Sequence, residues 1–129
     1  MNTKEFRQWV ELFALQSGLS IDRIEALILN AISAYVAKVQ SHGKGAYITK
    51  LENGQFETFR EWELVADDCV MDDPERQWRV LDAVDEGFDE AEVGDTVNVL
   101  VASPEPSRTY SSWVHQYLSR EIAKIKRGG

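Results

Sequence analysis

The stretch LENGQFETFREWELV, residues 51–65, decides how this chain can fold. Its Asn53-Gly54 pair tolerates the positive φ angles of a tight type I′ turn, and residues that favour β-strands flank the pair on both sides. The pattern predicts a β-hairpin with strands at Ala46–Leu51 and Gln55–Val65. Side chains alternate along the second strand, and the face that carries Glu57, Phe59, Glu61 and Glu63 is expected to be largely solvated.

Two helices are predicted before the hairpin. The first runs from about Thr3 to Gln16, where Ser17-Gly18 can end it. The second begins after Ser20, a suitable N-cap, and continues to about Gln40. One of its faces is an apolar stripe made of Ile21, Ile24, Leu27, Ile28, Ala31 and Tyr35. Leu29 and Val36 project from another side, so this helix is either packed between two layers or partly exposed to a partner.

The second half of the chain predicts two more strands and a long helix. An acidic connector at 66–75 leads to a strand from Gln77 to about Val84, and a further strand covers Thr96–Ala102. Ser107 is a suitable N-cap for a closing helix from about Arg108 to Arg127. We therefore expect an α+β fold with two N-terminal helices, a sheet of about four strands and a long C-terminal helix.

Composition restricts the classes of protein to consider. The 129 residues suit a single domain, and 43% hydrophobic with 28% charged residues is typical of a folded globular chain. No apolar run approaches the roughly 20 residues of a membrane span, and no signal peptide is recognisable, so a cytoplasmic protein is expected. Cys69 has no second cysteine to pair with and is expected to be a small buried side chain.

Motifs for catalysis or metal binding are missing from the sequence. His42 and His115 lie far apart, and neither has Cys, Asp or Glu at metal-ligand spacing. The acidic residues at 67–75 are interpreted as a solvated connector rather than a magnesium site. We find no phosphate-binding loop or nucleophile motif either. The chain is expected to be non-enzymatic and to need neither metal nor cofactor.

The hairpin, taken with the rest of the chain, resembles a known family. The order Phe56-Glu57-Thr58-Phe59-Arg60-Glu61-Trp62 is similar to that in the N-terminal domain of the bacterial transcription factor NusA. The similarity also includes the opening Met1-Asn2, the Leu19-Ser20 start of the second helix and the turn Val93-Gly94-Asp95-Thr96-Val97. The resemblance implies a bifurcated sheet and one domain over residues 1–129, with the S1 and KH domains of the family absent from this chain.

The resemblance implies that the chain binds a protein partner and catalyses no reaction. NusA is an accessory subunit of elongating bacterial RNA polymerase, and its N-terminal domain docks on the β-subunit flap near the RNA exit channel. There it modulates pausing, termination and antitermination. By this resemblance the partners are RNA polymerase and, weakly or indirectly, nascent RNA; a monomer without membrane contact is expected.

Two sets of candidate site residues follow. The resemblance places Arg108 and His115 toward RNA, and helical geometry puts Lys126 on the same stripe. Because His115 stands where other members carry lysine, its RNA contact should be weaker. We expect Leu29, Val36, Trp113 and Tyr117 to hold the apolar flap, although Trp and Tyr are equally common in cores.

Two other functions stay open at this stage. The net charge of −8 argues against nucleic-acid binding by the surface as a whole and suits a generic acidic protein-interaction module unrelated to transcription. A more remote alternative is a small hydrolase that uses the acidic residues at 67–75 with a metal.

Overall fold

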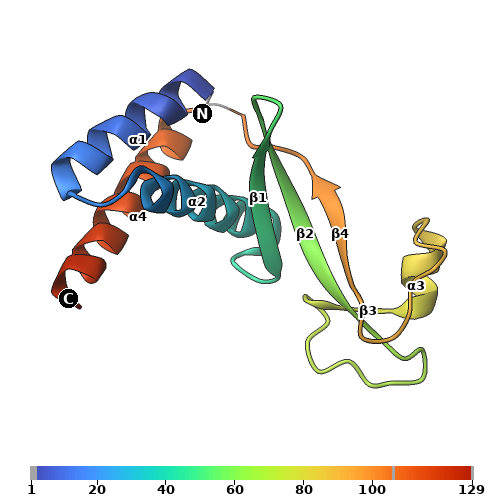
Figure 1. Cartoon of the computed structure of the whole chain (residues 1–129). Helices are drawn as coiled ribbons and strands as arrows, with labels where there is room; N and C mark the ends of the chain where they lie inside the picture. Colours follow the sequence, from blue (N-terminus) through green and yellow to red (C-terminus); the bar gives the residue numbers. More distant parts are fainter. Residues whose placement is uncertain (1–2, 106, 129) are drawn as a thin grey trace.

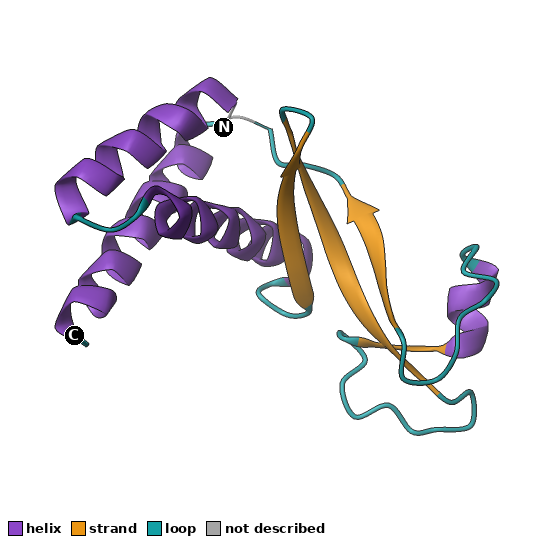
Figure 2. Ribbon diagram, in the orientation of Figure 1, coloured by secondary structure: helices purple, strands orange, loops and turns teal. Residues whose placement is uncertain are grey.

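The computed structural model describes residues 3–105 and 107–128 and confirms the α+β fold class (Figures 1 and 2). Three helices form a layer at one end, the sheet lies in the middle, and a short helix lies at the other end. In chain order the elements are α1 (Thr3–Ser17), α2 (Ile21–Ser41), β1 (Ala46–Glu52), β2 (Gln55–Val65), β3 (Gln77–Arg79), α3 (Val80–Asp85), β4 (Thr96–Val101) and α4 (Arg108–Arg127).

The residues predicted to begin or end the helices are found at the helix ends. The Ser20 hydroxyl accepts a hydrogen bond from the Arg23 backbone N–H at 3.2 Å, and Ser107 accepts one from Tyr110 at 3.1 Å. These bonds satisfy backbone donors that have no partner within the first turn of a helix. Gly18 has a φ of 76° and donates to the Ala14 carbonyl, which ends α1 with a left-handed residue.

Helix α2 lies at the centre of the larger core, between α1 and α4 on one side and β1 on the other (Figure 1). Of the two arrangements considered for this helix, the structure has the packed one. The Ser33 hydroxyl is 2.7 Å from that of Thr49 on β1, which in turn is 2.9 Å from that of Thr58 on β2. The core is made of Phe6, Val10, Phe13, Ile24, Ile28, Ala31, Ile32, Val36, Tyr110, Val114 and Leu118.

The sheet is organised around β2. The Asn53-Gly54 turn has φ angles of 52° and 76°, as a type I′ turn requires, and joins β1 to β2 in antiparallel register. Thr58 pairs with both Thr49 on β1 and Val101 on β4, so β1 and β4 lie on opposite edges of β2. The short β3 pairs in parallel with the end of β2, beyond β1. The four-stranded sheet is therefore mixed.

The prediction of a strand over Gln77–Val84 is wrong after Arg79, because Val80–Asp85 forms helix α3. A run as short as Val80-Leu81-Asp82-Ala83-Val84 does not distinguish strand from helix by its periodicity. The deciding contact is distant in sequence: the Asp67 carboxylate accepts the Leu81 backbone N–H at 2.8 Å. It caps the first turn of α3, and Ala83 is then buried against Leu64 and Val97 in a second, smaller core.

Arg60 holds the acidic connector against the hairpin. Its Nη2 donates to the Glu75 carboxylate at 2.9 Å and to the Glu75 carbonyl at 2.7 Å. The guanidinium lies 4.1 Å from the centre of the Trp62 ring, which is stacked on Trp78. On the same connector Cys69 is exposed, so the prediction of a buried cysteine is wrong. The thiol donates to the carbonyl of the neighbouring Val70 at 3.3 Å, and Cys69 belongs to neither core.

Candidate interaction site on the helical layer

Trp113 on α4 is held in place by α2. Its indole N–H donates to the Ala31 carbonyl at 3.1 Å, and its ring lies 5.9 Å from that of Tyr35. The Lys38 ammonium is 4.7 Å from the centre of the Trp113 ring, within the range of a cation–π interaction. The side chain is half-buried, so Trp113 both packs against the core and presents part of its ring at the surface.

Tyr117 lies one turn further along α4 and is also half-buried. The Arg120 guanidinium lies 5.6 Å from the centre of its ring. Burial and, second, the Glu121 carboxylate raise the pKa of Tyr117, while Arg120 acts in the opposite direction. The phenol therefore stays neutral at physiological pH and remains a hydrogen-bond donor. Along the seam of α2 and α4, Trp113 therefore lies beside Lys38, and Tyr117 lies beside Arg120.

The structure does not bring Leu29 and Val36 together with these aromatic residues. Trp113 contacts Ala31, Tyr35 and Lys38, which at 100° per residue lie on the side of α2 opposite to Leu29. Leu29 is half-buried against the core, and Val36 is only 2% exposed. A partner could not reach Val36 without opening the contact between α2 and the hairpin. The expectation that Val36 is an exposed anchor is therefore wrong.

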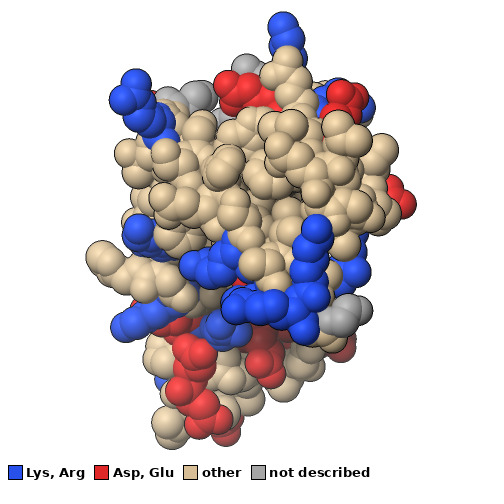
Figure 3. All heavy atoms as spheres, turned by 90° about the vertical axis from the view of Figure 1, so that its left-hand side faces the viewer, with Lys and Arg blue, Asp and Glu red and all other residues tan. Residues whose placement is uncertain are grey.

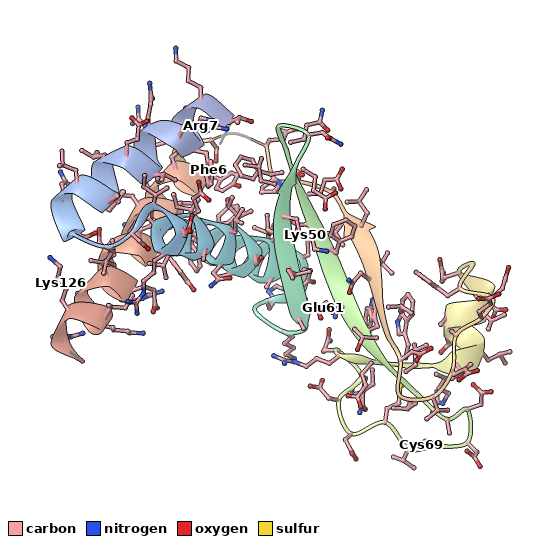
Figure 4. The ribbon with its side chains drawn as sticks, in the orientation of Figure 1. Phe6, Arg7, Lys50, Glu61, Cys69 and Lys126 are labelled. Carbon is pink, nitrogen blue, oxygen red and sulfur yellow. The ribbon has the colours of Figure 1, made fainter. Side chains whose placement is uncertain are left out.

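Arg108, His115 and Lys126 are all exposed on α4, but their surroundings differ. Arg108 lies in a groove of about 390 Å³ between α2 and α4, together with Tyr35, Lys38 and Trp113. The His115 ring contacts α1, with its centre 5.3 Å from that of Phe13. Lys126 lies near the end of α4 (Figure 4), about 27 Å along the helix from Arg108. These residues could follow an extended anion but could not surround a single small one.

The charges of the chain are strongly separated. Residues 52–95 carry 16 of the 22 acidic side chains and 3 of the 14 basic ones, so the remaining residues are net positive although the whole chain is −8. Figure 3, viewed from the side of the helical layer, shows Lys and Arg gathered in a band with Asp and Glu concentrated below it. The helical layer can therefore approach phosphate groups despite the acidic composition.

Sequence reasoning missed the roles of Tyr35, Lys38 and Arg120 in this arrangement. Tyr35 was assigned to the apolar stripe of α2, yet its ring is stacked on Tyr110 at 4.8 Å and also reaches Trp113. Lys38 carries no local signal, since its position beside Trp113 depends on how α2 crosses α4. Arg120 could have been found, because it follows Tyr117 by three residues on one helix.

Within residues 3–105 and 107–128, no group of three or more His, Cys, Asp or Glu side chains could hold a metal ion. In the same part of the chain, no helix is long and apolar enough to cross a membrane.

Comparison with known proteins identifies the family. The sequence profile of the NusA N-terminal domain matches residues 5–128. The chain belongs to the NusA N-terminal domain family. It is thus a domain of the kind found in a factor that regulates transcription elongation and termination. The solution structure of the N-terminal domain of NusA from B. subtilis is similar, with a TM-score of 0.59, 23% identity and coverage of 97% of this chain and 98% of that one. At this identity the likeness concerns the fold. No curated protein sequence matches the chain significantly.

Within the NusA N-terminal fold, the groove between α2 and α4 combines aromatic surface with positive charge. Its cations come from both helices, Lys38 from α2 and Arg108 from α4. Its aromatic rings also come from both, since Tyr35 lies on α2 and Trp113 on α4. The site is therefore built by the packing of two helices that are distant in sequence.

Proposed function

We propose that this chain is a non-enzymatic RNA polymerase-binding domain that docks on the β-subunit flap near the RNA exit channel and modulates pausing and termination. Membership of the NusA N-terminal domain family supports a role in transcription. The observation that carries the docking proposal is the seam of α2 and α4, where half-buried Trp113 lies beside Lys38 and half-buried Tyr117 lies beside Arg120. Rigid aromatic side chains with an exposed edge are frequent anchors in protein interfaces.

The proposed apolar contact rests on Trp113 and Tyr117, with Leu29 as a separate contact. Because Leu29 lies on the opposite side of α2 from Trp113, a single short helix of the partner cannot cover all three. Val36 supports the site by packing α2 against the hairpin instead of touching the flap. Alanine at such a buried position would affect binding only through the stability of the fold.

The proposed RNA contact lies on the basic part of the same layer. Arg108 in the groove and Lys126 near the end of α4 are exposed and separated by a distance that several nucleotides would span. His115 packs against Phe13 and offers only part of its ring to a phosphate. We expect a contact that is weak, insensitive to RNA sequence and weakened by salt, as phosphate contacts are.

Binding of the 129-residue chain to the isolated β-subunit flap tests this proposal. Tyr117→Ser should weaken binding by about fivefold or more, as loss of an interface anchor does. Leu15→Ser is the matched control, since Leu15 is 84% exposed at the end of α1 and away from the seam. The affinity of Leu29→Ser tests whether the side of α2 opposite to Trp113 also contacts the flap. Unchanged affinity for the folded Tyr117→Ser protein would refute the assignment of the seam.

A pause assay with core RNA polymerase tests the functional part. The chain should lengthen a hairpin-dependent pause, and Arg108→Ala should reduce this effect more at low salt than at high salt. Arg79→Ala, which removes a cation outside the helical layer, serves as the control.

The charge separation also favours the generic acidic interaction module as a second candidate, because residues 52–95 would attract basic proteins. A pull-down from bacterial lysate separates the two. Core RNA polymerase as the main captured protein supports the first proposal, whereas a different dominant partner supports the module.

A further inference from the structure

The face of the sheet that points away from α2 carries a row of apolar side chains. Thr49 and Thr58 point toward Ser33 on α2, so their neighbours along each strand point to the other face. On that face Phe59 on β2 is paired with Ile48 on β1 and with Leu100 on β4. Ile48 is 37% exposed and Leu100 is 60% exposed. The three side chains form an unbroken apolar row across the strands.

Such a row departs from the usual pattern of a solvated sheet face, where outward positions are polar. The cross-strand register puts the three residues side by side, so their exposed apolar area is continuous rather than scattered. No helix of the described part of the chain packs over this face, since α2 covers the opposite one. The row is therefore available to another molecule.

The charges around the row indicate what that molecule must be. Glu57, Glu61 and Glu63 share this face with Phe59, and none of them takes part in an ion pair within residues 3–105 and 107–128. The strand residues of this face include two cations: Lys50, paired in register with Glu57, and Arg79 on the short β3, at the far end of the face from Lys50. Lys50 and Glu61 are labelled on the hairpin in Figure 4. An acidic rim repels phosphate, and it also repels the same rim of a second copy of this chain. It attracts a segment rich in Lys and Arg.

The spacing of the row favours a helix over a strand as the occupant. Neighbouring strands lie about 4.8 Å apart, so the row extends about 10 Å from Ile48 to Leu100. Residues i, i+3 or i+4, and i+7 of an α-helix advance by a similar distance, about 10.5 Å. Alternate residues of an extended strand are about 6.8 Å apart and would lose register with the row.

From this geometry we propose that the outer face of the sheet, centred on Ile48, Phe59 and Leu100, is a docking surface for a basic amphipathic helix of a protein partner. The helix lies across the strands, places three apolar side chains on the row and directs Lys or Arg to Glu57, Glu61 and Glu63. This surface is separate from the seam of α2 and α4, and the proposal does not depend on binding to the flap.

The test is an NMR titration of the isotope-labelled 129-residue chain with a synthetic helical peptide. The peptide carries Leu at positions spaced i, i+4 and i+7 and Lys elsewhere on the same side; a second peptide has the same composition with the Leu positions scrambled. We expect resonances of β1, β2 and β4 to shift, and Leu100→Ser to weaken binding by about tenfold. Leu100 is exposed, so this variant should fold, which its melting curve checks.

Charge variants separate a specific surface from general attraction to an acidic chain. Glu61→Lys with Glu63→Lys should weaken binding by about tenfold, whereas Asp68→Lys with Asp72→Lys makes the same change in net charge on the connector and should cost less than about threefold. Equal losses for the two pairs, equal binding of the scrambled peptide, or shifts confined to α2 and α4 would each overturn the proposal.

Discussion

Replacing Arg60 should weaken the attachment of the acidic connector far more than replacing its ion-pair partner Glu75. The Arg60 side chain is 17% exposed and contacts four groups: the Glu75 carboxylate, the Glu75 backbone carbonyl, the Trp62 ring and, at 5.5 Å, the Tyr47 ring. The Glu75 side chain is 45% exposed, so solvent screens the ion pair. Most of the stabilisation by Arg60 should therefore come from the Glu75 carbonyl and the two rings, which Glu75→Gln leaves intact.

The magnitudes follow from these contacts. A hydrogen bond from a charged donor contributes about 1.5–3 kcal/mol, and a partly desolvated cation–π contact contributes about 0.5–2 kcal/mol. A half-exposed ion pair contributes less than about 1 kcal/mol. We expect Arg60→Leu, which keeps part of the packing, to lower the free energy of unfolding by about 3 kcal/mol. Glu75→Gln should lower it by about 0.5 kcal/mol.

The measurement is urea unfolding followed by tryptophan fluorescence, because Trp62 and Trp78 stack directly beside Arg60. Far-UV circular dichroism, which is dominated by the helical layer, shows whether the two cores unfold together. The reasoning is refuted if Glu75→Gln is as destabilising as Arg60→Leu, or if Arg60→Leu costs less than about 1 kcal/mol.

Gly45 provides an independent check of the same attachment. A Cβ at this position would lie 3.0 Å from Arg60 Nη2 and 3.2 Å from the Glu75 carbonyl, on a residue with a φ of 82°. Gly45→Ala should therefore be destabilising by itself and less so when Arg60 is already Leu, since the clash with the guanidinium is then absent. Additive effects of the two substitutions would contradict the contact.

Three further predictions concern the helical core and the helix ends. Leu118→Ala should cost about 2–5 kcal/mol in chemical unfolding, because Leu118 is fully buried; a cost below 1 kcal/mol, no more than an exposed site shows, would contradict its position in the core. Ser107→Ala should cost about 1 kcal/mol through loss of the cap on α4, with Ser112→Ala on the exposed face as the control. Burial and, second, the charge of Tyr35 raise the pKa of Tyr110 to about 12. Because the folded state then holds its proton more tightly than the unfolded state, this contribution to stability is complete below pH 10 and is lost as the pH rises through about 12. Tyr110→Phe should flatten the decline in stability between these values, and an unchanged decline would show that other groups cause it.

The sequence predicted well wherever neighbouring residues carry the signal. The Asn53-Gly54 turn and the caps at Ser20 and Ser107 depend on contacts within three residues, and all three are found as expected. The prediction failed at Val80–Val84, where the decisive hydrogen bond comes from Asp67. It also failed for Cys69, because burial on a connector depends on which side of a distant core the chain passes.

The site was predicted less well than the fold for the same reason. Arg108 and Trp113 were named as candidates, but for different surfaces, and only the crossing of α4 over α2 places them in one groove. Leu29 and Val36 are seven residues apart and so share one face of α2, yet Val36 is buried and Leu29 is only half-buried. Helical periodicity shows which residues share a face, and it does not show which faces another element will cover.

For this chain, local sequence was sufficient to determine the hairpin, the three long helices, their ends and the family resemblance, since turn geometry, capping and periodicity act over a few residues. Tertiary packing alone decided the rest: helix α3 and the groove shared by α2 and α4. These features depend on contacts between residues far apart in the chain, which form only when the helices and the sheet pack together.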